Sequence, residues 1–442
     1  MKGIVREPLP GFRDFEPADC AQRNFIFNQW RSVAHTFGYE EFDGPIVEPL
    51  DLFTQKSGPE IVEQLFSFQD KGERAIALRP EMTPSLVRMV GKRLATLKRP
   101  TKWFNITEQF RYERPQKGRL RSFYQFNADI IGESSSAADA ELIALAIATF
   151  QKFGLKKEHF HVRLSDRQLW VLWLNTFRVT QEQEIGALLG VLDKWERRSP
   201  ESIQEDLTAV FKDSTKATLF FNATEVLRKA RTLDAIRECF HNCQSSLNTE
   251  ALEQRLSEFK VLLQELESLG VRDWVTLDLT IVRGLAYYTG FVFEVFESGD
   301  QGRALAGGGR YDHLFEKLVG QPMPAVGFAA GDVTLTDLLH KQTLFPIYQS
   351  AVDCYVVFEQ TERQHALLLA QKLRETGFSV LYSLDLQKDL GKQQKKAYTD
   401  NPHYVITLTH ELASKTKTQV KDVKSGIEQI VDLKSLPEYL KQ

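Results

Sequence analysis

One stretch of the chain, from residue 102 to residue 131, constrains the possible folds more than any other. Apolar and polar side chains alternate along the run KWFNITEQFRYE, pause over the basic loop RPQKGRLR, and alternate again along SFYQFNADII. A period of two is the pattern of a strand whose two faces meet different surroundings. We therefore predict two long antiparallel strands that are joined by the loop.

The same period collects polar and charged side chains on one face of the predicted strand pair. Between Phe110 and Gln125 the chain has four arginines and one lysine but only one acidic residue, Glu113. Arginine can hold two phosphate oxygens at once, so this face suits a polyphosphate or an RNA end, although a solvated hairpin without such a role fits the pattern equally well. The residues expected on this face are Asn105, Thr107, Gln109, Arg111, Arg121, Phe123, Gln125, Asn127 and Asp129.

The basic character of this face is local, because the chain as a whole is slightly acidic. Its 56 Lys and Arg residues oppose 59 Asp and Glu residues, and a net charge of −3 argues against a protein that coats nucleic acid through bulk charge. The N-terminus has no signal-peptide pattern, and the most apolar run, residues 140–150, is far shorter than the roughly 20 residues of a membrane span. We expect a cytoplasmic protein without membrane association.

The four cysteines also favour a reducing compartment, because they are too few for a disulfide framework. Cys239 and Cys243 lie one helical turn apart on either side of His241. No second pair of ligands follows them, so we interpret this motif as a helix face rather than a zinc site.

The pattern of predicted elements divides the chain into four segments. Residues 1–167 and 267–340 mix helical and strand-like stretches, whereas residues 168–266 are poor in Pro and Gly and helical in period. Residues 350–442 alternate strands and helices, which predicts a small α/β domain with parallel strands. In the first segment we predict helices over residues 20–37, 84–98 and 137–153, with an extended stretch over residues 38–53.

Three further short motifs carry residues that suit a ligand site. LRPEMTPSLVRM places Glu81 and Thr83 at a proline-bounded turn, RGLAYYTG joins Arg283 to a pair of tyrosines, and AGGGRYD sets three glycines before Arg310 and Tyr311. Glycine allows a ligand or a neighbouring backbone to approach closely. Each motif alone also fits a tight turn or half-buried tyrosines, so the case for a site depends on their combination.

In combination and in this order, the motifs resemble those of the histidyl-tRNA synthetase family of class II aminoacyl-tRNA synthetases. FRYERPQKGRLRSFYQF resembles motif 2 of that class, GYEEFDGPIVEPLDLF resembles motif 1, and PAVGFAAGD resembles the start of motif 3. RGLAYYTG and AGGGRYD resemble the two histidine-specific signatures, and RPEMTPSLVR resembles the amino-acid-binding turn. The tail from residue 350 is similar to the anticodon-binding domain, so the resemblance covers nearly the whole chain apart from the helical segment.

The resemblance implies an α+β fold, in which an antiparallel sheet flanked by helices carries a helical insertion and precedes an α/β anticodon-binding domain. Residues 1–167 would hold motifs 1 and 2, and residues 267–340 would hold the histidine signatures and motif 3. The implied activity is that of an ATP-dependent ligase, which activates histidine as histidyl-adenylate and transfers it to the 3′ end of tRNA(His). The resemblance also implies a homodimer, and Mg²⁺ that accompanies ATP instead of occupying a cage of protein ligands.

The resemblance further assigns roles to individual residues. Arg111 and Arg283 would be the catalytic cations, and Arg114 and Gln116 would contact tRNA. The histidine-binding residues would be Glu81, Thr83, Gln125, Asp129, Arg283, Tyr287, Tyr288 and Tyr311. The ATP-binding residues would be Arg111, Glu113, Arg119, Arg121 and Phe123.

Three positions depart from the pattern of the family. Ala286 stands where the signature usually has aspartate, and Asp129 stands where many members have glutamate. Motif 3 lacks the arginine that usually contacts the phosphates of ATP. Arg119 and Arg121 are the nearest replacements in the sequence, and the competing account is that Asp332 holds an additional Mg²⁺.

Two other functions stay open on the sequence alone. Some relatives of the family are non-catalytic regulatory subunits of histidine biosynthesis, but they typically lose the Arg-Gly-Leu signature and the anticodon-binding tail, which this chain keeps. An RNA-binding paralogue with an inactive site would account for the missing motif 3 arginine.

Overall fold

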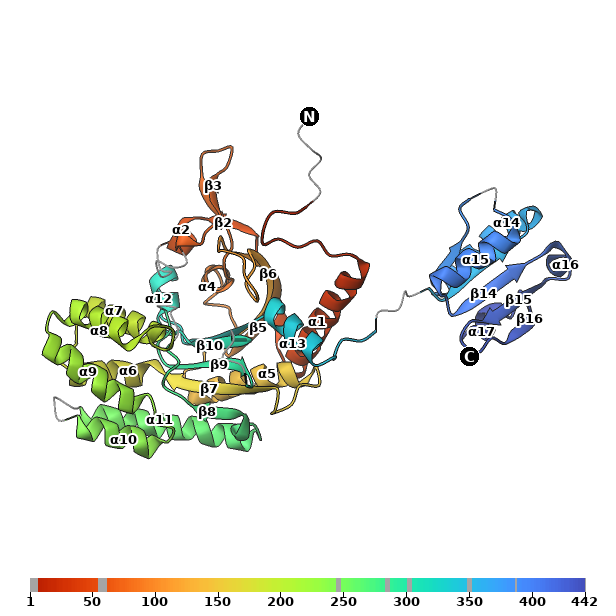
Figure 1. Cartoon of the computed structure of the whole chain (residues 1–442). Helices are drawn as coiled ribbons and strands as arrows, with labels where there is room; N and C mark the ends of the chain where they lie inside the picture. Colours follow the sequence, from red (N-terminus) through yellow and green to blue (C-terminus); the bar gives the residue numbers. More distant parts are fainter. Residues whose placement is uncertain are drawn as a thin grey trace. The chain divides into compact units, whose positions relative to one another are not determined.

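The computed structural model describes residues 7–54, 62–243, 248–282, 287–299, 304–347, 352–385 and 388–441. The chain forms two compact units, Met1–Pro346 and Ile347–Gln442 (Figure 1). The second unit has a hydrophobic core of its own, which includes Val356, Ile406 and Leu373. The predicted α+β class is confirmed.

The first unit is built on an eight-stranded mixed sheet. The predicted strand pair is present as β5 and β6, which are antiparallel with Thr101 opposite Ile131 and Phe110 opposite Ser122. The central strands are antiparallel as predicted, but the outermost pairs β1–β5 and β7–β8 are parallel. In spatial order the strands are β1 (Glu40–Glu41), β5 (Thr101–Phe110), β6 (Ser122–Ile131), β11 (Ala325–Gly331), β10 (Ala306–Arg310), β9 (Phe291–Glu297), β7 (Phe160–Asp166) and β8 (Val275–Leu277).

The apolar face of this sheet is covered by α1 (Pro17–Thr36), α5 (Ser136–Gln151) and α13 (Asp332–Lys341). Trp30 of α1 is fully buried and stacks on Phe126 of β6, with 5.7 Å between the ring centroids. Phe126 also meets Phe328 of β11 edge to face. Burial of these aromatic side chains fixes which face of the strands turns inward, so the polar set of β5 and β6 lies on the opposite face.

On the polar side of the sheet, α4 (Thr83–Gly91) packs against α12 (Leu314–Val319). The predicted helix over residues 84–98 is therefore wrong at its end, because the helix stops at Gly91. Glycine is a poor helix former, and an added Cβ at this position would lie 2.6 Å from Val319 Cγ1. The glycine thus ends the helix and allows the close contact with α12.

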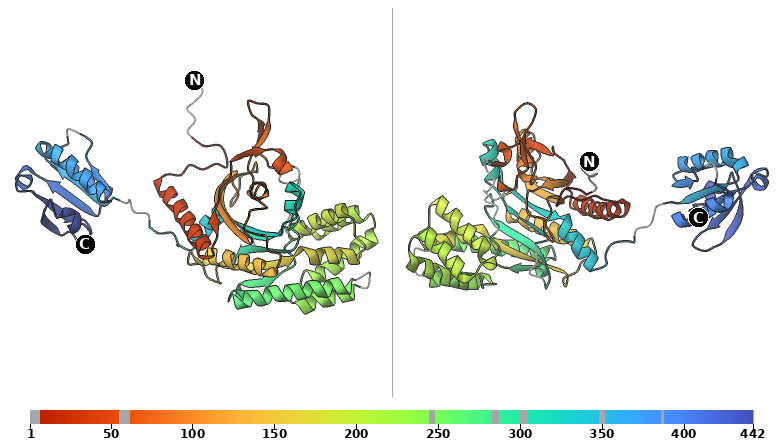
Figure 2. Two further views of the ribbon diagram at one scale, coloured as in Figure 1. Left: turned by 180° about the vertical axis from the view of Figure 1, so that it is seen from behind. Right: turned by 45° about the horizontal axis from the view of Figure 1, so that its top comes forward.

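The extended stretch over residues 38–53 contributes β1 and one strand of a small three-stranded sheet. The other two strands of this sheet, within residues 67–78, form the orange hairpin that projects from the first unit in Figure 2. Its order is β2 (Val47–Pro49), β4 (Ala75–Leu78) and β3 (Ser67–Gln69), and α2 (Asp51–Thr54) follows β2. Several apolar side chains of this region, including Ile46 and Phe68, are about half exposed.

Residues 168–266, predicted to be helical, form a helical bundle whose core includes Trp173, Phe220 and Phe240. Its helix α11 packs against both α6 and α5, and Arg255 of α11 forms a buried ion pair with Asp166 at the end of β7. The bundle is therefore fastened to the sheet. Its elements are α6 (Arg167–Thr176), α7 (Glu182–Lys194), η1 (Trp195–Arg197), α8 (Pro200–Phe211), α9 (Ser214–Leu227), α10 (Leu233–Asn242), α11 (Thr249–Ser268) and η2 (Arg272–Trp274).

The second unit contains the predicted parallel strands and two antiparallel strands that the sequence pattern did not indicate. The sheet order is β13 (Val380–Tyr382), β12 (Cys354–Phe358), β14 (Tyr404–Leu408), β15 (Lys417–Asp422) and β16 (Glu428–Asp432). Its helices are η3 (Gln360–Glu362), α14 (Arg363–Glu375), α15 (Leu390–Asp400), α16 (His410–Ala413) and α17 (Leu436–Tyr439). Among the described residues, no helix of either unit is long and apolar enough to cross a membrane.

Candidate active site

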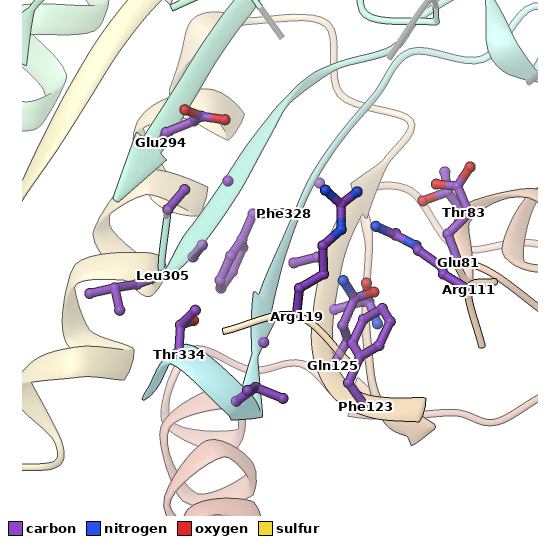
Figure 3. A pocket seen from close by; sticks show the side chains of 18 of the residues that line it. Glu81, Thr83, Arg111, Arg119, Phe123, Gln125, Glu294, Leu305, Phe328 and Thr334 are labelled. Atoms are coloured by element: carbon purple, nitrogen blue, oxygen red, sulfur yellow. The ribbon is translucent and has the colours of Figure 1, made fainter. Parts of the chain in front are cut away.

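A cavity of about 800 Å³ opens on the polar face of the large sheet (Figure 3). Its lining comes from β6, β9, β10 and β11, from the turn before α4, from the loop between β5 and β6, from η1 of the helical bundle and from the start of α13. Most of the residues singled out from the sequence line this one space. They are Glu81, Thr83, Arg111, Glu113, Arg119, Phe123, Gln125, Asp129, Tyr287, Tyr288 and Tyr311.

A ladder of hydrogen bonds between buried amide and hydroxyl groups supports the β5–β6 side of the cavity. Gln109 Nε2 donates to Thr107 Oγ1 at 2.8 Å, and Thr107 Oγ1 donates to Asn105 Oδ1 at 2.8 Å. Asn127 Nδ2 of β6 donates to the same Asn105 oxygen at 3.1 Å. Because the ladder ties the two strands together, it fixes the wall from which Gln125 and Asp129 project.

One end of the cavity holds a buried carboxyl group at Asp129. The Tyr311 hydroxyl donates to Asp129 Oδ1 at 2.6 Å. Burial raises the pKa of Asp129 to about 7, although the hydrogen bond from Tyr311 acts in the opposite direction. This group therefore changes charge near neutral pH, at a position that lines the cavity.

Space for the Asp129 carboxylate depends on a glycine of the neighbouring strand. Gly327 pairs with Asp129 across the β6–β11 ladder, and an added Cβ on Gly327 would lie 1.9 Å from Asp129 Oδ1. No other residue fits there without displacing the carboxylate. The sequence motif that contains Gly327 gave no sign of this contact, because the two residues are 198 positions apart.

A second carboxylate–tyrosine pair lies at the same end of the cavity. The Tyr287 hydroxyl donates to Glu81 Oε2 at 2.9 Å, and the Tyr287 ring meets the Tyr311 ring edge to face with 5.9 Å between centroids. Burial holds the pKa of both phenols well above the ordinary value, so they remain hydrogen-bond donors at neutral pH. This end can accept hydrogen bonds from the amino or ring N–H groups of a small ligand.

Arg111 and Phe123 form the neighbouring part of the lining. Arg111 Nε donates to the Pro80 carbonyl oxygen at 3.0 Å, and the guanidinium lies 5.2 Å from the centroid of the Phe123 ring. Arg119 makes a close ion pair with Glu113. Figure 3 shows Arg119 between Glu81 and Arg111 on one side and Glu294 on the other. These contacts present fixed cations toward an anionic ligand.

Three predicted site residues lie elsewhere. Arg121 is not part of the cavity lining, because its Nε donates to the Glu113 carbonyl oxygen at 3.0 Å and its guanidinium lies over the Tyr112 ring at 4.3 Å. Arg114 and Gln116 line a separate hollow of about 310 Å³, to which Glu113 and Arg119 also contribute. Arg283 and Ala286 fall outside the described residues.

At the start of α13, the carboxylate of Asp332 is engaged away from the cavity. Arg13 Nη2 donates to Asp332 Oδ2 at 2.7 Å, and the backbone N–H of Tyr124 donates to Oδ1 at 2.8 Å. The cavity is lined instead by the uncharged Val333 and Thr334. The account in which Asp332 holds an additional Mg²⁺ is therefore unsupported. Among the described residues, no cluster of three or more His, Cys, Asp or Glu side chains could hold a metal ion.

The raised pKa of Asp129 leads to a testable prediction about stability. The unfolded chain releases this proton near pH 4 and the folded chain near pH 7, so stability falls as pH rises through that window. Asp129→Asn removes the charge but can still accept from Tyr311. Its melting temperature should exceed that of the wild type at pH 8 by about 2–4 °C, and the gain should shrink at pH 5. Scanning calorimetry at both pH values checks this, and a gain that grows toward pH 5 would contradict it.

Comparisons with known proteins agree with one another along the chain. The sequence model described as "Histidyl-tRNA synthetase" matches residues 11–334, and that described as "Anticodon binding domain" matches residues 353–442. A histidine–tRNA ligase from Opitutus terrae is 43% identical over 429 residues, which cover 96% of this chain and 95% of the relative.

Solved structures give the same result at the level of the fold. The histidyl-tRNA synthetase of Nostoc sp. PCC 7120 superimposes with a TM-score of 0.77 at 23% identity and covers 99% of both chains. A Bacillus halodurans C protein described as an ATP phosphoribosyltransferase regulatory subunit/histidyl-tRNA synthetase has a TM-score of 0.72 at 25% identity. It covers 92% of this chain and 99% of its own.

Proposed function

The chain belongs to the histidyl-tRNA synthetase family, and from this premise we propose that it is an ATP-dependent histidine–tRNA ligase whose active site is the cavity on the large sheet. The observation that carries the proposal is the convergence of two buried carboxylate–tyrosine pairs and fixed arginines in one space. One end then suits an amino acid with an N–H-bearing ring, and the other suits a polyphosphate.

In the proposed reaction, an oxygen of the histidine carboxylate attacks the α-phosphorus of ATP, and the bond to the β-phosphate oxygen breaks. Histidyl-adenylate and pyrophosphate are the products. Two anions must meet, so cations placed between them stabilise the transition state most. Arg111 and Arg283 take this role in the proposal. The 3′-terminal hydroxyl of tRNA(His) then attacks the activated carbonyl and releases AMP.

The histidine substrate is assigned to the end of the cavity with the two carboxylate–tyrosine pairs. Glu81, Thr83 and Gln125 are placed at the α-amino group, and Arg283 at the carboxylate. The imidazole is assigned to Asp129 and Tyr288, with Tyr287 and Tyr311 holding the two carboxylates in position. The hydrogen bond from Tyr311 to Asp129 supports this assignment, because it leaves Asp129 Oδ2 for the ligand.

ATP is assigned to the remainder of the cavity. Phe123 offers an aromatic face to the base, and Glu113, Arg111 and Arg119 are placed around the base and phosphates. Arg121 lies over the Tyr112 ring, so in this proposal it supports ATP binding indirectly, by holding the conformation of the loop between β5 and β6. ATP enters as its Mg²⁺ complex, in which the metal offsets phosphate charge. The cavity carboxylate Glu294 provides oxygen atoms of the kind that Mg²⁺ accepts.

The tRNA is assigned to three surfaces outside the cavity. Arg114 and Gln116 in the small hollow contact the acceptor end, residues 168–266 hold the acceptor arm, and residues 350–442 read the anticodon. The match of residues 353–442 to an anticodon-binding domain supports the last assignment.

We further propose a homodimer formed through the motif 1-like segment. Large apolar side chains are exposed around the small sheet, among them Ile46 and Phe68 at 47% and 49%. Exposed apolar side chains that gather on one surface mark an interface. Light scattering at micromolar concentration should give about twice the 50.6 kDa of one chain. Ile46→Asp with Phe68→Asp should halve that mass, and a fully active wild-type monomer would disprove the dimer.

Pyrophosphate exchange tests the proposed function against its alternatives. Label from pyrophosphate should enter ATP only when histidine, of the twenty amino acids, is present. A regulatory subunit or an RNA-binding paralogue would give no exchange with any amino acid. The match to an anticodon-binding domain and the 43% identity to a histidine–tRNA ligase favour the ligase over both.

A further inference from the structure

The cavity contains an arginine that neither the motifs nor the comparisons assign. Its described lining includes four carboxylates, Glu81, Glu113, Asp129 and Glu294, but only three cations and no lysine. Two of the cations are Arg111 and Arg119 from the motif 2-like hairpin. The third is Arg197, which comes from η1 of the helical insertion.

The charge of the cavity makes a third cation important. Arg119 is paired with Glu113, and Arg121 lies outside the lining. At the start of α13, where the family places an arginine, this chain presents Val333 and Thr334. A triphosphate that enters such a site needs positive charge from another element.

The short helix η1 is anchored by the two residues that precede its exposed arginine. Trp195 is buried and stacks on Phe221, with 5.1 Å between the ring centroids. Glu196 accepts from Arg163 Nη2 of β7 at 3.3 Å. Within the described part of the chain, Glu196 forms ion pairs and Arg197 forms none. The backbone of η1 is therefore anchored next to Arg197, while the Arg197 side chain is exposed and lines the cavity.

The position of η1 places Arg197 at the β9 wall of the cavity. The Arg163 guanidinium that bonds to Glu196 also lies over the Phe296 ring at 4.9 Å, and Phe296 is part of the lining. Glu294 lies two residues earlier on the same strand. Figure 3 shows Glu294 on the side of Arg119 that faces away from Glu81 and Arg111. Arg197 thus approaches the end of the cavity that is remote from the carboxylate–tyrosine pairs.

We infer that Arg197 binds the β- and γ-phosphates of ATP and supplies the cation that motif 3 lacks. The inference depends on the proposed function, because it assumes that the cavity binds ATP. Arg197 also contacts the departing pyrophosphate, so it stabilises the charge that develops when the bond to the α-phosphorus breaks. Binding of ATP is then coupled to the position of the helical insertion, which carries this arginine.

The test compares Arg197→Ala with the wild-type protein in the absence of tRNA. In histidine-dependent pyrophosphate exchange, we expect the KM for ATP to rise about tenfold or more, with the KM for histidine changed less than threefold. Calorimetric titration with ATP should give a similar loss of affinity. Arg197→Lys keeps the charge but not the two-pronged geometry, so it should recover part of the loss.

The neighbouring Arg198 provides the matched control. It is paired with Asp206 on the exposed side of the bundle and is absent from the cavity lining, so Arg198→Ala should retain wild-type kinetics. An unchanged KM and affinity for ATP in Arg197→Ala would overturn the inference. The inference would also be overturned if Arg197→Ala were impaired only in tRNA charging, because that result would assign Arg197 to binding of the tRNA acceptor end.

Histidine-dependent pyrophosphate exchange by the wild-type protein tests the proposed function. The KM for ATP of Arg197→Ala, relative to that of the wild type, tests the role of Arg197. Calorimetric titration compares the ATP affinity of Arg197→Ala with that of the wild type, and it tests the role of Arg197 even if neither protein catalyses exchange. Failure of the proposed ligase function and failure of the inference about Arg197 therefore give different results.

Discussion

Replacing Arg111 by alanine is expected to reduce histidyl-adenylate formation by about 10³-fold while leaving the fold intact. Arg111 is held by the Pro80 carbonyl oxygen and by the face of Phe123, and it lines the cavity beside the proposed histidine site. A cation that is fixed between two anionic reactants acts mainly on the transition state. The loss should therefore appear in kcat more than in the KM for either substrate.

Two variants make this result interpretable. Arg111→Lys retains the positive charge but lacks the planar guanidinium group, which can donate two parallel hydrogen bonds, so it should recover only part of the rate. Arg31→Ala removes an exposed arginine of α1 that pairs with Glu41, and it should behave as the wild type. If Arg111→Ala keeps its melting temperature and exchanges pyrophosphate within tenfold of the wild-type rate, the catalytic assignment is wrong.

A chain that ends at Pro346 should still form histidyl-adenylate but should charge tRNA poorly. All described lining residues of the cavity belong to the first unit, and the second unit has a separate core. Loss of an RNA-binding module removes phosphate contacts and base recognition together, so kcat/KM for tRNA should fall by about 10²-fold or more.

The control for this truncation is the rate of pyrophosphate exchange in the same preparation. A near-normal rate shows that the first unit is folded and active. An equal loss of exchange and of charging would instead assign the second unit a structural role.

The strand pair could be predicted because its cause is local. Burial of Phe104 and Phe126 on one face forces their neighbours onto the other, and this alternation is visible in the sequence itself. The same reasoning placed Gln125 and Asp129 correctly in the cavity. It did not place Arg121, whose backbone N–H donates to the Gly11 carbonyl oxygen and whose guanidinium contacts Glu113 and Tyr112 outside the cavity lining.

Features that depend on distant contacts could not be predicted in this way. Asp332 is bound by Arg13, which is 319 positions away, and Gly327 is required only because β11 pairs with β6. Arg197 belongs to an insertion whose sequence pattern is merely helical, and the contact that links its helix η1 to the sheet joins Glu196 to the distant Arg163 of β7. No local signal marks such residues.

Charging of tRNA(His) is the most direct test of the proposed ligase activity. Purified full-length protein is incubated with labelled histidine, ATP, Mg²⁺ and a tRNA(His) transcript, and acid-precipitable label is counted. We expect histidine to be esterified to the 3′ end in amounts approaching one per tRNA, with no charging when ATP is omitted or when another tRNA is supplied. Absence of charging by a protein that binds tRNA(His) and ATP would contradict it.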